Sequence, residues 1–209
     1  MRGWYRTLRP ASMWRAFSTI YRRDFWTQGS GPGSTLENTA VYRAVLSRIL
    51  NEHPDCQRVV DLGCGDWQFS QAMDWSSVDY VGVDVVRSVI EDNRRKYGSR
   101  AEFKCLDVVR GDLPKGDFVI LKDILQHWPL KTIQDFLPRL KQYKWALITN
   151  SGYKASTLNT DCGLSGYRPL DLRQQPFHIV AKEIAWYQTD EATEEVKDKL
   201  MLLIDTAEL

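Results

Sequence analysis

Short apolar runs and helical stretches alternate through the middle of the chain, over 57–150. The apolar runs are rich in Val and Ile, are bounded by polar residues, Gly or Pro, and cover 58–63, 79–86, 101–108, 117–123 and 145–150. Their almost continuous apolarity is typical of parallel strands covered on both faces. Helical patterns at 88–98 and 131–142 separate the runs. This order predicts βαβ units and therefore a doubly wound α/β sheet.

The carboxyl-terminal third follows a different pattern. Residues 151–177 are polar and marked by Gly and Pro, and a connection of this length inside a domain is typically functional or disordered; its aromatic and Leu residues favour order. Apolar runs at 183–188 and 199–204 predict a closing antiparallel pair of strands. A helix over 190–204 remains an alternative, because periodicity does not separate short strands from short helices.

The amino-terminal part predicts a helical cover in front of the sheet. Apolar positions in 35–53 fall on one helical face, and the Gly-rich segment 29–34 predicts a loop at the start of that helix. We expect 1–34 to form a helical and Gly-rich lid and 35–209 to form the main domain. Upstream aromatic residues beside arginines predict core or lid positions, with an acidic membrane or RNA as the alternative contact: Trp14, Phe17, Tyr21 and Trp26.

Composition limits the class of protein. The 209 residues are 43% apolar and 26% charged, which fits one domain with a buried core. A formal net charge of +1 gives no general reason to expect a nucleic-acid partner. The four cysteines lack the close paired spacing of metal or disulfide sites, and residues 1–23 lack the apolar stretch of a signal peptide or membrane span. We therefore expect a reduced, cytoplasmic protein with no bound metal.

The sharpest motif is VVDLGCGDW (59–67), in which a predicted strand ends in the pattern D-x-G-x-G. Gly63 and Gly65 permit positive φ and let the backbone approach a ligand closely. We expect the turn to lead into a helix that begins near Gln68 and directs its first amides at that ligand.

Acidic residues end the next two predicted strands. Asp84 ends the strand that follows the glycine motif, where a carboxylate can accept hydrogen bonds from both hydroxyls of a ribose. Asp107 ends the third strand, where the edge of an adenine would lie. Together these positions predict a nucleoside site at the carboxyl edge of the sheet.

The charges around the glycine turn argue against a nicotinamide dinucleotide. Gln68 stands where the third glycine of G-x-G-x-x-G belongs, and Asp61 and Asp66 bracket the turn that a pyrophosphate would approach. A ligand with an ammonium group suits this surrounding better. S-adenosylmethionine has adenine, ribose, a cationic sulfonium and an amino-acid end without phosphate, so it fits these positions.

In these motifs the chain resembles the class I S-adenosylmethionine-dependent methyltransferases. VVDLGCGDW is similar to their first motif, VGVDVV to their second, CLDV to their third and FVILKDILQHWP (118–129) to their fourth. The resemblance covers 57–150 and implies a Rossmann-like sheet of seven strands with the last one antiparallel. GSGPGS and SGYRPLDL also resemble a bacterial subgroup linked with glycan and small-molecule methylation.

The resemblance implies a role for individual residues. Asp61, Gly63 and Gly65 surround the methionine part of the cofactor, and Lys122 and Asp123 border the transferred methyl. The remaining implied contacts are Asp84 with Val85 at the ribose, Asp107 with Val108 at the adenine, Cys64 in the turn, and Ser30 and Gly31 in the covering loop.

Methyl transfer depends mainly on alignment, but a hydroxyl acceptor must also lose its proton. His127 follows the fourth strand at the ligand-binding edge and has the pKa of a competent base, although it also suits a structural role beside Trp128. Asp123 is the second candidate, either as the base or as the residue that orients His127. An acceptor pocket is predicted from three residues of the late loop, with the arginine holding an anionic group: Tyr167, Arg168 and Asp171.

Two other functions stay open at this point. An RNA-modifying methyltransferase would dock through the basic amino-terminal segment, and a non-catalytic protein could keep the fold and bind the cofactor only. The fourth motif lacks the D/N-P-P-Y/F pattern of adenine-N6 enzymes. We expect methyl transfer to the hydroxyl of a small molecule or saccharide.

Overall fold

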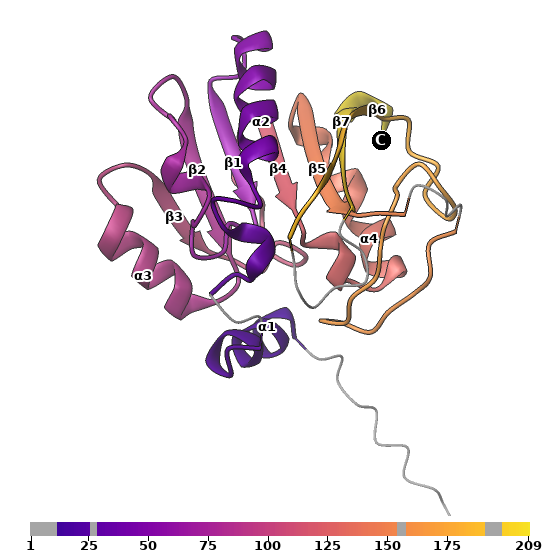
Figure 1. Ribbon diagram of the computed structural model, residues 1–209, viewed down its shortest axis with the longest axis horizontal. Helices are drawn as coiled ribbons and strands as arrows, with labels where there is room; N and C mark the ends of the chain where they lie inside the picture. Colours follow the sequence, from indigo (N-terminus) through magenta and orange to yellow (C-terminus); the bar gives the residue numbers. More distant parts are fainter. Residues whose placement is uncertain (1–11, 26–28, 154–157, 191–197) are drawn as a thin grey trace, which may run out of the picture.

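A seven-stranded sheet forms the centre of the computed structural model, which describes residues 12–25, 29–153, 158–190 and 198–209. The strands lie in the order β3-β2-β1-β4-β5-β7-β6 (Figure 1). Their bounds are Arg58–Leu62 (β1), Asp79–Asp84 (β2), Glu102–Cys105 (β3), Phe118–Lys122 (β4), Trp145–Ser151 (β5), Lys182–Gln188 (β6) and Asp198–Asp205 (β7). The first five run parallel, and β7 is antiparallel to both β5 and β6. The predicted α/β sheet with an antiparallel closing strand is confirmed.

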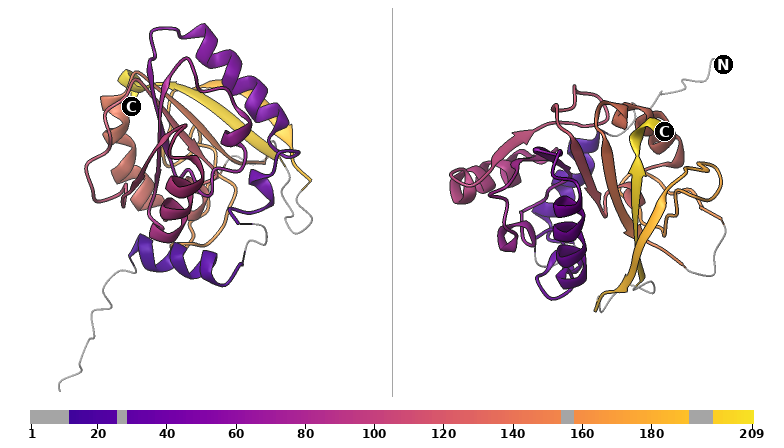
Figure 2. Two further views of the ribbon diagram at one scale, coloured as in Figure 1. Left: turned by 90° about the vertical axis from the view of Figure 1, so that its left-hand side faces the viewer. Right: turned by 90° about the horizontal axis from the view of Figure 1, so that it is seen from above.

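Helices cover both faces of this sheet. The α-helices are Met13–Arg22 (α1), Ala40–Glu52 (α2), Arg87–Tyr97 (α3) and Leu130–Phe136 (α4). Helices α2 and α4 lie on opposite faces, and α1 lies across one end of the sheet (Figure 2). None of the helices in the described part of the chain combines the length and the apolar character needed to cross a membrane.

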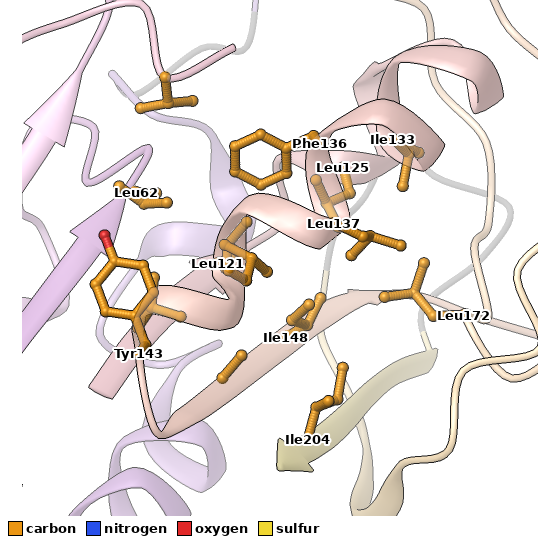
Figure 3. Packing of buried hydrophobic residues seen from close by; sticks show 14 of the residues in the cluster. Leu62, Leu121, Leu125, Ile133, Phe136, Leu137, Tyr143, Ile148, Leu172 and Ile204 are labelled. Atoms are coloured by element: carbon orange, nitrogen blue, oxygen red, sulfur yellow. The ribbon is translucent and has the colours of Figure 1, made fainter. Parts of the chain in front are cut away.

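Strand β4 shows why its apolar pattern is continuous. Val119 and Leu121 belong to the core on the α4 side of the sheet, which Figure 3 shows around Leu121 and Phe136. Phe118 and Ile120 belong to the second core, which contains residues of α2. A strand buried on both faces needs an apolar side chain at every position, as the sequence pattern predicts.

Several predicted bounds shift for local reasons. The helix predicted over 35–53 begins only at Ala40. The helix predicted over 131–142 changes to a 3₁₀-helix at Leu137, because Pro138 has no N–H to continue the α-helical hydrogen bonds. Strand β3 is shorter than predicted, so Asp107 lies in the turn after it. The second strand of the closing pair is present as β7. Residues 191–197 and Trp26 lie outside the described residues.

The α-helix predicted to begin near Gln68 is wrong; only a 3₁₀ turn, Ser70–Ala72, forms there. Trp67 has a positive φ of 63° and is fully buried, with its ring centroid 5.5 Å from that of Phe103. Phe69 is buried as well. Both side chains enter the same core. Residues two positions apart point to opposite sides of an α-helix, whereas this segment directs both to one side.

The described part of the long loop 151–177 is packed into the structure. Leu170 and Leu172 are fully buried in the core on the α4 side. The peptide N–H of Leu170 donates to the carbonyl oxygen of Ser151, at the end of β5. The loop is therefore tied to the carboxyl edge of the sheet, beside the cavity described below.

Candidate active site

A cavity opens at the carboxyl edge of the sheet, beside β1 and β4, where the order of the strands changes direction. It encloses about 1150 Å³ of empty space, part of which is open to solvent. Its walls come from the glycine turn after β1, from the ends of β2, β3 and β4, and from the amino-terminal segment that contains α1. Open α/β sheets bind ligands at such a switch point in strand order.

The glycine turn packs tightly against the chain after β4. Gly63 has a φ of 81°, and the backbone N–H groups of Gly63 and Cys64 both donate to the carbonyl oxygen of Val83, at 2.8 and 3.0 Å. A Cβ at Gly63 would lie 2.3 Å from Cγ2 of Ile124. Glycine is required here both by conformation and by space.

The loop 29–34 covers the same turn from the outside. Ser30 Oγ accepts a hydrogen bond from the N–H of Asp66 at 2.8 Å, and the N–H of Ser30 donates to Asp66 Oδ2 at 3.3 Å. The hydroxyl of Tyr21 lies 2.8 Å from Ser30 Oγ. A Cβ at Gly65 would lie 2.2 Å from Ser30 Oγ. We name the contacts among Tyr21, Ser30, Gly65 and Asp66 the lid clasp.

Asp84 is buried at the end of β2, where the sequence predicts the ribose site. Its carboxylate accepts the N–H groups of Gly65 at 3.2 Å and Val86 at 2.9 Å. Burial raises the pKa of Asp84 to about 6, although the backbone hydrogen bonds act in the opposite direction. The carboxylate is held between the glycine turn and the start of α3, facing the cavity.

Asp61 lies deeper in the cavity, on β1. Its residue exposure is 1%, and the hydroxyl of Tyr80 donates to its Oδ2 at 2.6 Å. Burial raises the pKa of Asp61 to about 7, against the opposing effects of the Tyr80 hydrogen bond and the charge of Lys122. A cation bound in the cavity would favour the ionised form of this carboxyl.

The residues that the sequence predicts at an adenine also line the cavity. Asp107, Val108 and Val85 line it together with Leu106. Asp107 Oδ1 accepts the N–H of Val109 at 3.1 Å, which orients the carboxylate in the turn after β3. Apolar walls next to an acceptor group suit a flat heterocycle that carries an amino group.

Asp123 lies between two lysines at the end of β4. Lys122 forms an ion pair with Asp123 and donates to the carbonyl oxygen of Gly33 at 2.9 Å. Lys199 Nζ lies 3.4 Å from Asp123 Oδ1 and donates to Ser151 Oγ at 3.0 Å. Burial acts to raise the pKa of Asp123, but the two ammonium groups outweigh it and lower the pKa to about 2.

This pairing corrects the second candidate for the base. A carboxyl with a pKa of about 2 holds a proton only weakly and is a poor general base near neutral pH. Nor does Asp123 hold Nδ1 of His127, which lies 2.8 Å from the carbonyl oxygen of Gly166. Asp123 instead pairs with both buried lysines and offsets one of their two positive charges.

His127 lines the cavity from the 3₁₀ turn Leu125–His127. A carbonyl oxygen can only accept, so Nδ1 carries the hydrogen in its contact with Gly166, and Nε2 keeps its lone pair. The side-chain nitrogen of Gln126 lies 3.5 Å from Nε2, and its oxygen accepts the N–H of Ser151 at 2.7 Å. Burial lowers the pKa of His127, partly opposed by the Gly166 hydrogen bond and the charge of Asp123. The ring is therefore a neutral acceptor at neutral pH.

The predicted acceptor residues of the late loop do not line this cavity in the described part of the chain. Arg168 is buried and donates to the carbonyl oxygens of Gln126 and Trp128, each at 2.7 Å. Asp171 is paired with Arg173 at 2.8 Å. Tyr167 is a neighbour of His127, with ring centroids 6.0 Å apart. Arg168 supports the turn that carries His127, so the expectation that it holds an anionic acceptor group is wrong.

Lys199 and Gln126 are site residues that sequence reasoning missed. Lys199 is the second residue of β7 and directly precedes its apolar run, and its burial at 1% exposure could not be read from the sequence. Gln126 lies within the fourth motif, but its contacts to β5 depend on how β4 and β5 are placed together.

Comparisons with solved structures agree with this geometry. A protein described in the conversion of a disulfide bond into a thioacetal group during echinomycin biosynthesis superposes with a TM-score of 0.62, at 16% identity, over 91% of this chain and 90% of that one. The 1,6-didemethyltoxoflavin-N1-methyltransferase of Burkholderia thailandensis, which contains S-adenosylhomocysteine, gives 0.56 at 16% identity over 94% and 92%. Magnesium protoporphyrin IX methyltransferase of Synechocystis gives 0.55 at 14% identity over 79% and 78%.

This chain has the fold of class I methyltransferases. No protein-family model matches the sequence, and no curated protein is significantly similar to it. At such low identities the likeness establishes the methyltransferase fold and not a substrate.

The charges of the cavity fit the ligand expected of a methyltransferase fold. Lys122 and Lys199 are the only lysines or arginines among the described residues that line it, and both are bound to Asp123. Asp61, Asp66 and Asp84 line the same cavity. These carboxyls suit a ligand with an ammonium group and ribose hydroxyls and disfavour a pyrophosphate.

Proposed function

We propose that this protein transfers a methyl group from S-adenosylmethionine to a hydroxyl of a small molecule or saccharide, with His127 as the general base. The observation that carries the proposal is the position of His127 in the same cavity as Asp61 and Asp84. The Gly166 contact holds the tautomer that accepts a proton at Nε2.

The residues of the cavity divide into three functions. Asp84 would hold the ribose, Asp107 and Val108 the adenine, and Asp61 with the glycine turn the amino-acid end. The lid clasp keeps Ser30 over the glycine turn and so limits access of water to this end. The bound sulfonium supplies an activated methyl group that needs no further activation by the protein.

His127 performs the remaining step. As the acceptor oxygen bonds to the methyl carbon, the carbon–sulfur bond breaks, and the hydroxyl proton passes to Nε2 of His127. The low pKa of the buried ring means that it is unprotonated and ready at neutral pH. Proton transfer to a positioned base contributes on the order of 10²- to 10⁴-fold in rate.

Two measurements test the proposal in sequence. Calorimetry with S-adenosylmethionine should show binding by the wild type and a large loss in Asp84→Ala; no binding by the wild type contradicts the proposal at its first step. Methyl-labelled cofactor incubated with the protein and fractionated host extract should then give a labelled product. Cofactor binding without any labelled product would instead favour a non-catalytic binding protein.

A further inference from the structure

Helix α1 presents two chemically different faces. Met13, Phe17 and Tyr21 line the cavity. Trp14, on the helix, is 51% exposed, and Phe25, just after the helix, is 63% exposed. Two large exposed aromatic side chains, one on the helix and one just after it, leave apolar surface available for a partner.

Three arginines lie close to these two aromatic residues in the sequence. Arg15, Arg22 and Arg23 are all exposed, and Asp24 is the one acidic residue in 12–25. We name the exposed set the basic aromatic face: Trp14, Arg15, Arg22, Arg23 and Phe25.

The amino-terminal segment and the rest of the chain carry net charges of opposite sign. Residues 1–23 contain six arginines and no acidic residue. The whole chain has 28 Lys and Arg against 27 Asp and Glu, so the remainder, 24–209, has 22 against 27. An anionic surface therefore attracts the amino-terminal segment and repels the rest of the protein, which orients the molecule.

We propose that the basic aromatic face binds the surface of an anionic lipid membrane. Arginines near such a surface each strengthen binding by about fivefold, and Trp and Phe insert at the level of the headgroups. An RNA site would stack bases on rings along a positive groove, whereas these rings lie on the outer surface of a single helix and the turn that ends it. The ten residues of α1 are too few to span a bilayer, so the contact is peripheral.

Membrane binding through this face has a consequence for the cavity. The same helix lines the cavity with its other side, so the site would lie about 10 Å, one helix diameter, from the lipid surface. This position suits an acceptor presented at the membrane surface.

Vesicle cosedimentation of the full chain tests the proposal without any cofactor. Wild-type protein should pellet with vesicles of 30% phosphatidylserine in phosphatidylcholine at 0.1 M salt, and not with phosphatidylcholine alone. Partitioning should fall steeply at 0.5 M salt. The triple variant Arg15→Glu, Arg22→Glu, Arg23→Glu should lose at least tenfold in partitioning, and Trp14→Ser with Phe25→Ser at least threefold.

Matched controls separate the face from net charge and from exposed apolar area. Arg48→Glu, Arg95→Glu and Lys131→Glu make the same charge change at side chains that are 60%, 70% and 78% exposed. Leu158→Ser with Val180→Ser removes apolar groups that are 67% and 68% exposed, more than Trp14 and Phe25. Both control variants should partition like the wild type, and thermal melting verifies that all variants fold.

Three results would overturn the proposal: no pelleting of the wild type with anionic vesicles, an equal loss in the charge-matched control, or salt-sensitive binding of single-stranded RNA in place of vesicles. Because no cofactor is present in these measurements, none of them depends on whether the protein transfers methyl groups.

Discussion

The imidazole Nδ1 of His127 lies 2.8 Å from the carbonyl oxygen of Gly166, 39 residues further along the chain. This one contact determines the tautomer of the ring, because the carbonyl can only accept. It depends in turn on Arg168, whose guanidinium holds the carbonyl oxygens on either side of His127, those of Gln126 and Trp128. The late loop thus determines the position and the tautomer of His127, the proposed base.

Replacing His127 tests its role as the base. His127→Ala should lower the rate of methyl transfer to a hydroxyl acceptor by about 10²- to 10⁴-fold while cofactor affinity stays within about twofold. The wild-type rate at saturating cofactor should rise with pH through an apparent pKa below the ordinary value of histidine and then stay level to pH 8.5, because burial lowers the pKa of the ring. An undiminished rate in His127→Ala at pH 7.5 would remove the assignment.

Replacing Arg168 tests whether its side chain supports the turn that carries His127 or binds an acceptor. Arg168→Met leaves the carbonyl oxygens of Leu125, Gln126 and Trp128 without this donor, and we expect a loss of about 3 kcal/mol or more in the free energy of unfolding. Denaturant unfolding measures this loss. If the variant is as stable as the wild type but has a raised KM for an anionic acceptor, the original acceptor-pocket assignment of Arg168 is restored.

One substitution that creates a steric clash in the lid clasp, and a second that removes it, test these contacts. Gly65→Ala places a Cβ within 2.2 Å of Ser30 Oγ, so we expect weaker cofactor binding by at least tenfold. Ser30→Gly removes that oxygen, and the double variant should recover part of the affinity. Calorimetry measures all three proteins. A double variant that is no better than Gly65→Ala would mean that the positive φ of Gly65, and not the lid, causes the loss.

Tyr21→Phe gives a milder test of the same clasp. It removes only the hydroxyl that lies 2.8 Å from Ser30 Oγ. We expect a loss of about 1 kcal/mol in the free energy of unfolding and no change in the pH dependence of the rate. The matched control is Tyr153→Phe, since Tyr153 is 46% exposed and lies outside the cavity lining.

Asp61 and Asp84 predict a pH dependence of cofactor affinity. Their pKa values are raised by burial to about 7 and about 6, so both carboxyls take up protons as the pH falls through this range. Binding of a cationic ligand favours the ionised forms, so affinity should rise from pH 5.5 to pH 8 and protons should be released on binding at pH 6. Calorimetry in buffers of different ionisation enthalpy measures this release.

The same groups affect stability in the opposite direction. Between about pH 4 and 7 the folded, ligand-free protein keeps protons that the unfolded chain has released, so these two carboxyls lower the free energy of unfolding as the pH rises. Asp61→Asn should therefore melt at a higher temperature than the wild type at pH 8, with a smaller difference at pH 5. An equal difference at both pH values would contradict the raised pKa.

The sequence by itself determined the layered architecture and the position of the site. Apolar runs such as that of β4 can be stable only when covered on both faces, and the parallel strands that follow from this bring Asp61 and Asp84 to one edge of the sheet. Gly63 and Gly65 indicated the turn there because few other residues adopt a positive φ. Apolar runs and glycine motifs are properties of neighbouring residues, so a pattern along the chain reveals them.

Only the tertiary structure decided which polar groups lie close enough to form hydrogen bonds and ion pairs. Lys199 reaches Asp123 across 76 residues, and Ser30 reaches Asp66 across 36. The burial of Trp67 against Phe103 replaced the predicted helix after the glycine turn by an irregular segment. The physical reason is common to all three cases: pKa, ion pairing and the cost of burying a side chain depend on neighbours in space, which no periodicity along the sequence reveals.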